Sequence, residues 1–256
     1  MNKRSKHAVM AVALALTGLM TSRIALAADE QPPSAEQIAK WHQEEEDRLH
    51  NDPAYLNRYA ADNEKLLATP GSVKVVFMGD SITQLWVEKT PDFFKPGWVG
   101  RGISGQTTAQ MLMRFRQDVI DLHPKVVHIM AGTNDLAQNL GPVSPQQLKN
   151  NIMSMVELAQ AHHIKVILAG IPPAVDFKWR PGLDPAPKIA AHNAWLKDYA
   201  AKVGALYVDY KDSVGDDKGD FKPGLASDGV HPTPAGYAAL DPQAEKVVEK
   251  ALAEAK

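Results

Sequence analysis

The 256-residue sequence contains no cysteine. This absence excludes disulfide bonds, thiolate metal sites, a cysteine nucleophile and the cysteine that carries the lipid of a lipoprotein. A fold without disulfides has to be held together by its hydrophobic core. With 45% hydrophobic residues, the chain has enough apolar material for one sizeable domain.

After its first residues the sequence also lacks any long apolar run. Lys3, Arg4 and Lys6 precede an apolar run over about residues 8–20, and small residues typical of a cleavage site follow at 25–27. The run is shorter than the ~20 residues that span a membrane. The sequence therefore predicts a signal peptide over residues 1–27, a periplasmic or secreted protein, and no stable membrane insertion after cleavage.

An excess of positive charge is missing as well. The formal net charge is −2, and removal of the four basic residues of the leader, which has no acidic residue, brings it to about −6. Nucleic-acid-binding proteins carry a basic surface, so nucleic acid is not an expected partner. The sequence gives no indication of an oligomeric state.

Residues 28–72 form a separate N-terminal helical arm in this interpretation. Ser34 and Gln37 have the spacing of a capping box, and Asp52-Pro53 places a capping side chain before a proline at the first position of a second helix. The turn residues at 69–72 end the arm. We expect the arm to pack on the core or to extend as an accessory helix pair.

From residue 73 to 256, apolar strands alternate with amphipathic helices. The predicted strands are 73–78, 125–130, 164–169 and 205–210. Predicted helices carry the stripe Met111, Leu112, Phe115, Val119 and Leu122, begin at Ser144-Pro145, and cover 186–203. This alternation predicts an α/β fold with a parallel central sheet, in which ligands bind beyond the carboxyl ends of the strands.

Three short motifs contain residues that could act in catalysis at the carboxyl edge of the sheet. Ser81, in Gly-Asp-Ser, follows the first strand, where a plain helix-capping serine is the alternative. Asn134 follows a later strand and offers a neutral donor for an oxyanion, with an Asx-turn as the alternative. Asp228 stands three residues before His231, so its carboxylate can orient a general-base imidazole, although such a pair is also common in surface turns.

In this order the motifs resemble those of the SGNH (GDSL-like) hydrolase family over about residues 73–240. Residues 102–107, Gly-Ile-Ser-Gly-Gln-Thr, match the family's second block. The resemblance implies a three-layer α/β/α flavodoxin-like fold and a Ser81, His231 and Asp228 triad. It also implies an oxyanion hole formed by the Ser81 N–H, the Gly105 N–H and the Asn134 side chain, with no metal and no cofactor.

Position 100 departs from the family pattern. Related sequences often have Asn-Arg-Gly where this chain has Gly100-Arg101-Gly102. With Gly at position 100, residues 100–105 match the dinucleotide-binding pattern G-x-G-x-x-G. Asp118 or Asp121 would be the acidic residue that such a site has about 20 residues further on. The preceding strand would be little more than Trp98-Val99, which argues against a nucleotide site.

We therefore expect a serine ester hydrolase that works through an acyl-enzyme. The sequence Met-Gly-Asp-Ser-Ile-Thr-Gln-Leu-Trp is similar to the acetylhydrolase and lysophospholipase-like branch, which favours short acyl groups such as acetyl on sugars or polysaccharides. Residues 171–187 are expected to form a wall of the pocket. A lysophospholipase or thioesterase with the same groups, and a catalytically silent carbohydrate-binding protein, remain the alternatives.

Overall fold

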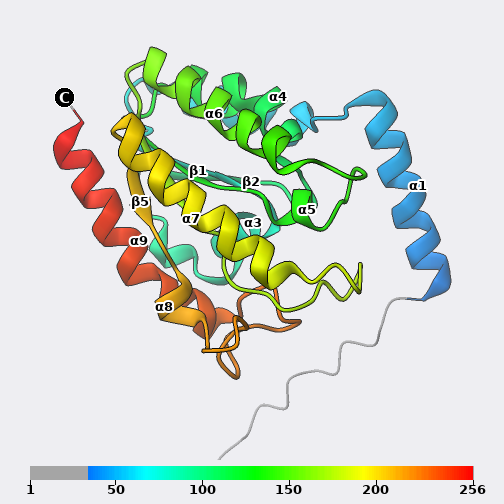
Figure 1. The fold of residues 1–256 in the computed structure, drawn as a ribbon. Helices are drawn as coiled ribbons and strands as arrows, with labels where there is room; N and C mark the ends of the chain where they lie inside the picture. The colour runs from blue at the N-terminus through cyan, green and yellow to red at the C-terminus, as the bar shows by residue number, and fades with distance from the viewer. Residues whose placement is uncertain (1–33, 256) are drawn as a thin grey trace, which may run out of the picture. The chain divides into compact units, whose positions relative to one another are not determined.

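Five parallel strands form the centre of the structure, a computed structural model that describes residues 34–255 (Figure 1). Their order in the sheet is β2-β1-β3-β4-β5, and each neighbouring pair is parallel. The strands are β1 (Val75–Gly79), β2 (Trp98–Gly102), β3 (Val126–Met130), β4 (Lys165–Ala169) and β5 (Leu206–Val208). The last residues of β1, β2 and β3 stand side by side, since Gly79 pairs with Gly102 and Met130.

Helices connect the strands. The α-helices are α1 (Ala35–Asn51), α2 (Ala60–Leu67), α3 (Ser81–Lys89), α4 (Thr108–Asp118), α5 (Thr133–Leu136), α6 (Pro145–Ala161), α7 (Pro185–Val203), α8 (Lys211–Val214) and α9 (Pro234–Glu254). Short 3₁₀ helices are η1 (Leu56–Arg58), η2 (Pro91–Phe93) and η3 (Ile120–Leu122).

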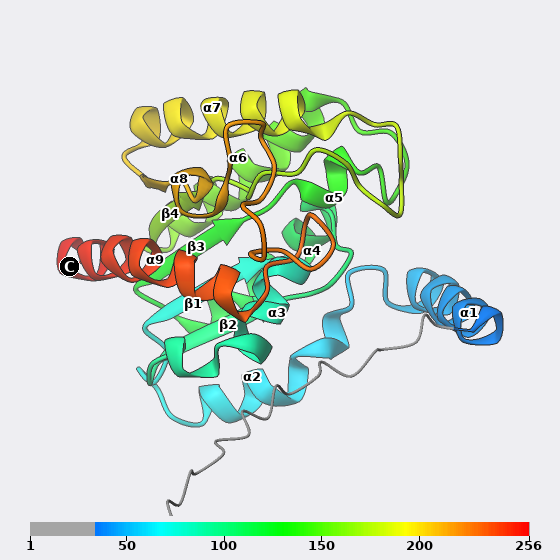
Figure 2. The same ribbon diagram turned by 90° about the horizontal axis from the view of Figure 1, so that it is seen from below.

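The sheet is covered on both faces, because successive strand residues point to opposite sides. One hydrophobic cluster joins Phe77 to Trp86 of α3 and Leu240 of α9. The other joins Met78 to Phe115 of α4 and to residues of α6 and α7. Figure 2 shows the strands between α6 and α7 on one side and α3 and α9 on the other. The predicted three-layer α/β/α fold with a central parallel sheet is confirmed.

Two strands differ from the sequence prediction. β2 runs over Trp98–Gly102, although Gly100, Arg101 and Gly102 have little tendency to form strands and only Trp98-Val99 was expected. Pairing with the buried strand β1 extends it. The strand expected over 205–210 is shorter, because Tyr210 turns into α8 and only Leu206–Val208 pair with β4.

The chain divides into two compact units, Met1–Gln43 and Glu44–Lys256. The predicted signal peptide, residues 1–27, lies outside the described residues. The capping box is confirmed, since Ser34 and Gln37 each accept the other's backbone N–H. The helix start at Pro53 is wrong: the Asp52 carboxylate instead accepts the N–H groups of η1, and α2 begins at Ala60.

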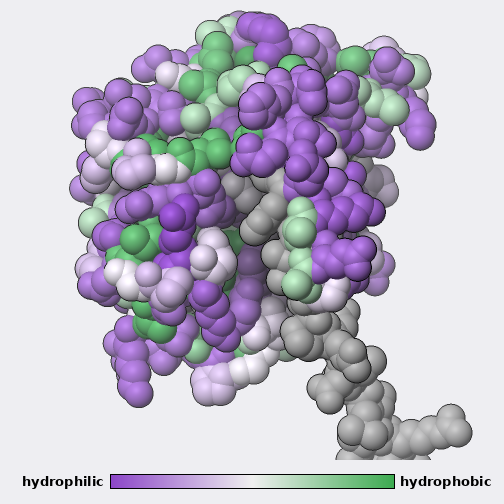
Figure 3. Space-filling model, turned by 90° about the vertical axis from the view of Figure 1, so that its right-hand side faces the viewer, coloured by the Kyte–Doolittle hydropathy of each residue, from purple (hydrophilic) through white to green (hydrophobic). Residues whose placement is uncertain are grey.

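The face in Figure 3 is largely hydrophilic, with hydrophobic side chains in small separate patches. Over the described residues, no helix has both the length and the apolar character needed to cross a membrane.

Candidate active site

Ser81 lies at the corner where β1 turns into α3. Gly79 ends the strand, Asp80 caps the helix by accepting the N–H of Ile82 at 3.0 Å, and Ser81 is the first helical residue. The corner is tight, because a Cβ at Gly79 would collide with the side chain of Thr83. The Ser81 hydroxyl is thereby fixed at the carboxyl edge of the sheet, at a helix N-terminus where negative charge is favoured.

A chain of hydrogen bonds runs from Ser81 to Asp228. Ser81 Oγ lies 2.8 Å from His231 Nε2, and His231 Nδ1 lies 2.7 Å from Asp228 Oδ2. A carboxylate only accepts, so Nδ1 carries the proton and Nε2 is left to accept from the hydroxyl. The other oxygen of Asp228 accepts the N–H groups of Val230 and His231, which fixes the loop before α9.

The pKa of His231 is raised and that of Asp228 is lowered by their contact. Burial alone would lower the pKa of His231, but the hydrogen bond and charge of Asp228, with the charge of Asp80, raise it above its ordinary 6.5. Burial would raise the pKa of Asp228, and its hydrogen bonds from His231 outweigh that and hold it far below 3.8. The carboxylate is therefore ionised at neutral pH and favours the imidazolium form of His231.

The side chain of Asn139 links Gly105 and Asn134. Gly105 has φ +78 in the turn after β2, and Asn134 lies in α5 directly after β3. Asn139 Nδ2 lies 2.8 Å from Asn134 Oδ1 and 3.4 Å from the Gly105 carbonyl oxygen. Asn134 Nδ2 donates to the Gln106 carbonyl at 3.0 Å. Within residues 34–255, no hydrogen bond joins Gly105 or Asn134 to Ser81.

Comparison with known proteins gives the family. The sequence model of the GDSL-like lipase/acylhydrolase family matches residues 77–239, more than half of the chain. The chain belongs to the GDSL-like lipase/acylhydrolase family. Within it, a GDSL-like lipase from Bacteroides thetaiotaomicron is 44% identical, with a TM-score of 0.73 over 77% of this chain and 98% of that one. A candidate acylhydrolase from Bacteroides fragilis is 47% identical, with a TM-score of 0.75 over 79% and 99%.

Two further relatives differ more from this chain. Axe2, an acetylxylan esterase from Geobacillus stearothermophilus, is 22% identical with a TM-score of 0.56 over 70% of this chain and 95% of that one, which shows a shared fold alone. An uncharacterized lipoprotein of Bacillus subtilis, YqeF, is 35% identical over 124 residues, 41% of this chain. The match spans about half the length, 51%, of that curated relative.

The glycines of the dinucleotide-like pattern serve packing in this protein. Gly100 and Gly102 lie inside β2, whereas a nucleotide site needs them in the turn that opens a helix. A Cβ at Gly102 would collide with the backbone of α3, and one at Gly100 would collide with Val87. Position 100 is therefore packed directly against α3.

Asp135 holds the two blocks of the site together, a role that the sequence did not indicate. Its carboxylate accepts the Thr108 N–H at 2.8 Å and the Thr108 hydroxyl at 2.6 Å, which ties α5 to the start of α4. Burial raises the pKa of Asp135, and these two hydrogen bonds oppose that rise. Asn134 is thus placed by its own neighbour in the chain.

A fully buried cation, Arg114, lies under the site. Its guanidinium donates to the carbonyl oxygens of Gly79 and Arg101, to Gln106 Oε1, and to the Asp118 carboxylate at 2.9 Å. These groups belong to the ends of β1 and β2, to the turn after β2 and to α4. Because an uncompensated buried charge is costly, the satisfied guanidinium fixes these four elements relative to one another.

Residues 53–63 pack on the same region. The Gln106 and Gln110 side chains donate to the carbonyl oxygens of Ala54 and Pro53, both at 2.8 Å. Asn63 donates to Asp118 and accepts from Arg101 through its amide oxygen. The part of the predicted arm that belongs to the second unit therefore contacts the turn that carries Gly105.

The predicted pocket wall, residues 171–187, brings Trp179 beside His231. The two rings have centroids 6.2 Å apart, and 43% of Trp179 is exposed. The buried ring of Phe177 supports the indole at 5.1 Å. Trp86 and Trp98 are instead buried in the hydrophobic core.

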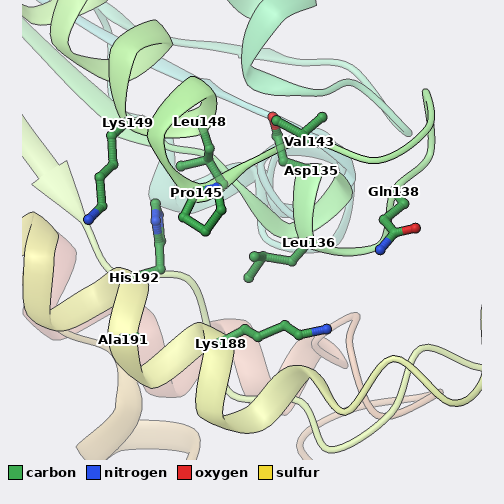
Figure 4. A pocket seen from close by; sticks show the side chains of 10 residues that line it. All are labelled: Asp135, Leu136, Gln138, Val143, Pro145, Leu148, Lys149, Lys188, Ala191 and His192. Atoms are coloured by element: carbon green, nitrogen blue, oxygen red, sulfur yellow. The ribbon is translucent and has the colours of Figure 1, made fainter.

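A cavity of about 330 Å³ lies between α5, α6 and α7 (Figure 4). Its lining includes Asp135 and Leu136 of α5, Leu148 of α6 and His192 of α7, and it contains none of Ser81, Asp228 and His231. Burial lowers the pKa of His192 to about 4, so its ring is neutral. Across residues 34–255, no group of three or more His, Asp or Glu side chains is arranged to hold a metal ion.

Proposed function

We propose that this acylhydrolase is a serine ester hydrolase with Ser81 as nucleophile, His231 as general base and Asp228 as the group that orients it. The observation that carries the proposal is the unbroken series Ser81 Oγ, His231 and Asp228, with separations of 2.8 and 2.7 Å, at the carboxyl edge of the sheet. A merely capping serine would not require a paired imidazole.

In the proposed reaction, His231 Nε2 takes the Ser81 proton as Oγ attacks the ester carbonyl carbon. The negative charge on the carbonyl oxygen is held by the N–H groups of Ser81 and Gly105 and by the Asn134 side chain. The protonated His231 then gives its proton to the leaving alcohol, and the acyl group remains on Ser81. Water, deprotonated by His231, releases the acid and restores the serine.

We propose short-chain acyl esters as substrates, with acetyl groups on sugars or polysaccharides as the natural class. The family supports an ester substrate, and the local sequence around Ser81 supports a short acyl group. The half-exposed indole of Trp179 beside His231 provides a flat aromatic surface of the kind on which sugar rings pack.

A p-nitrophenyl ester series from C2 to C12 tests the activity and the acyl length together. We expect the highest kcat/KM at C2, labelling of Ser81 by a serine-reactive phosphonate, and loss of both in Ser81→Ala with little change in Tm. Labelling at another residue, or full activity in Ser81→Ala, would refute the assignment. A maximum at C8 to C12 would favour a lysophospholipase or thioesterase, and absence of turnover and labelling would favour the carbohydrate-binding alternative.

We also propose that the protein is exported and works in the periplasm or outside the cell. The basic and apolar character of residues 1–20 supports this, and the Bacillus subtilis relative is named a lipoprotein. Mature protein should begin at Ala28, which N-terminal sequencing measures. An intact N-terminus on protein recovered from the cytoplasmic fraction would contradict export.

A further inference from the structure

A second series of hydrogen bonds leads from the pocket wall to Asn134. The Trp179 indole Nε1–H donates to Asn139 Oδ1 at 3.1 Å, and Asn139 Nδ2 donates to Asn134 Oδ1 at 2.8 Å. We propose that Trp179 and Asn139 are positioning residues that set the orientation of the Asn134 amide. The inference rests on the proposed function, in which Asn134 Nδ2 binds the oxyanion.

The direction of the series follows from its first donor. An indole N–H can only donate, so the oxygen end of the Asn139 amide has to face Trp179. The nitrogen end of Asn139 then faces Asn134, where only an oxygen can accept. Asn134 Oδ1 consequently points to Asn139, and Nδ2 is turned to the opposite side of the amide.

The far side of the Asn134 amide agrees with this orientation. Nδ2 carries two hydrogens, and one of them is bonded to the Gln106 carbonyl at 3.0 Å. The second hydrogen is left for the oxygen of a substrate. A flipped Asn134 would place Oδ1 against the Gln106 carbonyl and Nδ2 against the Asn139 amide nitrogen, so two favourable contacts would become repulsive ones.

Trp179 also connects this orientation to the substrate. Its exposed indole stands beside the His231 ring, so a leaving group bound there contacts the same side chain that holds Asn139. The acylhydrolase thus orients its oxyanion donor from the wall that contacts the alcohol part of the ester. Asn139 Nδ2 is also 3.4 Å from the Gly105 carbonyl, which joins the second proposed donor to the same amide.

Two substitutions test this series of hydrogen bonds, here called the relay, while keeping an aromatic ring at position 179 and the fold intact. Trp179→Phe keeps an aromatic ring against Phe177 and removes the N–H together with part of the larger indole ring, and Asn139→Ala deletes the linking amide. One hydrogen bond contributes modestly, and the Gln106 carbonyl still orients Asn134, so each variant should lose roughly 2- to 10-fold in kcat on p-nitrophenyl acetate with KM within about twofold. Trp195→Phe and Asn150→Ala, matched changes away from the site, should leave both constants unchanged.

A double-mutant cycle separates positioning from general damage. In an Asn134→Ala background there is no Asn134 amide left to orient, so Trp179→Phe should lower kcat no further. Asn139→Ala should then act only through its long contact with the Gly105 carbonyl and lower kcat much less than it does in the wild-type background. Full additive loss in that background, or a loss that appears in KM alone, would overturn the relay. Failure of the proposed function has a different signature, since Ser81→Ala would then retain activity.

A spectroscopic measurement needs no turnover. In ¹H–¹⁵N spectra, Trp179→Phe should shift the side-chain amide signals of both Asn139 and Asn134, although no hydrogen bond joins Trp179 directly to Asn134 in the described residues. Trp195→Phe should leave both signals in place. An Asn134 signal that does not move in Trp179→Phe refutes the relay whatever the enzyme hydrolyses.

Discussion

Replacing Asp80 with asparagine should stabilise the protein at neutral and basic pH. Asp80 is buried, and its Oδ2 has no hydrogen-bond partner in the described residues. Burial raises the pKa of this carboxyl from 3.8 to about 6, although the Ile82 N–H lowers it. An asparagine can still accept from Ile82 through its oxygen. The Thr133 hydroxyl, near enough to lower the pKa of Asp80, can accept from the new amide.

The size of the effect follows from the two pKa values. Asp80 releases its proton near pH 3.8 in the unfolded chain and near pH 6 in the folded protein. Protonation of Asp80 therefore stabilises the folded state fully below pH 3.8, and this stabilisation is lost as the pH rises through 6. A shift of about two units corresponds to about 3 kcal/mol. Asp80→Asn should therefore unfold with nearly the wild-type free energy at pH 4 and exceed it by about 3 kcal/mol at pH 8.

Urea unfolding of the full chain at a series of pH values measures this difference. Asp92→Asn, an exposed change in η2, serves as the control and should follow the wild-type curve. A difference between Asp80→Asn and wild type that is constant with pH, or that is largest at pH 4, would show that the reasoning about buried charge is wrong.

Two further predictions concern the proposed catalytic groups. Asn134→Ala should lower kcat by ~10²–10³ with little change in Tm, and unchanged esterase activity would remove Asn134 from the oxyanion hole. Asp228→Asn should lower turnover by roughly 10³–10⁴. It should also move the acidic limb of the pH profile, which wild type shows above pH 6.5, to lower pH, because the carboxylate of Asp228 that raises the His231 pKa is lost and only the charge of Asp80 remains to raise it. A limb that stays in place would contradict this assignment.

The layers of the fold could be predicted because local patterns determine them. The buried strands β1, β3 and β4 are apolar along their whole length, and the stripe of α4 has helical spacing. The positions of Ser81 and Asn134 after strands, and of His231 before a helix, could also be predicted, since each residue lies in a short motif. β2 was underestimated because its length depends on pairing with β1 rather than on its own residues.

The supporting residues could not be found in this way. Arg114 lies on the same helical stripe as Met111 and Phe115, where hydrophobic periodicity gives no reason to expect a buried cation. Asn139 and Trp179 are forty residues apart and meet only after the fold has formed. Hydrogen bonds between distant segments have no period, so a single sequence contains no signal for them.

The contacts of residues 53–63 affect how far the chain can be shortened. A form that begins at residue 73, the predicted start of the hydrolase domain, would keep all five strands and the groups proposed for chemistry. It would also lose the carbonyl that Gln106 donates to and the amide that bridges Arg101 and Asp118. The side chains of Gln106, Arg101 and Asp118 would then lose these buried partners and face water near the turn that carries Gly105. We therefore expect the shortest functional fragment to begin before Pro53.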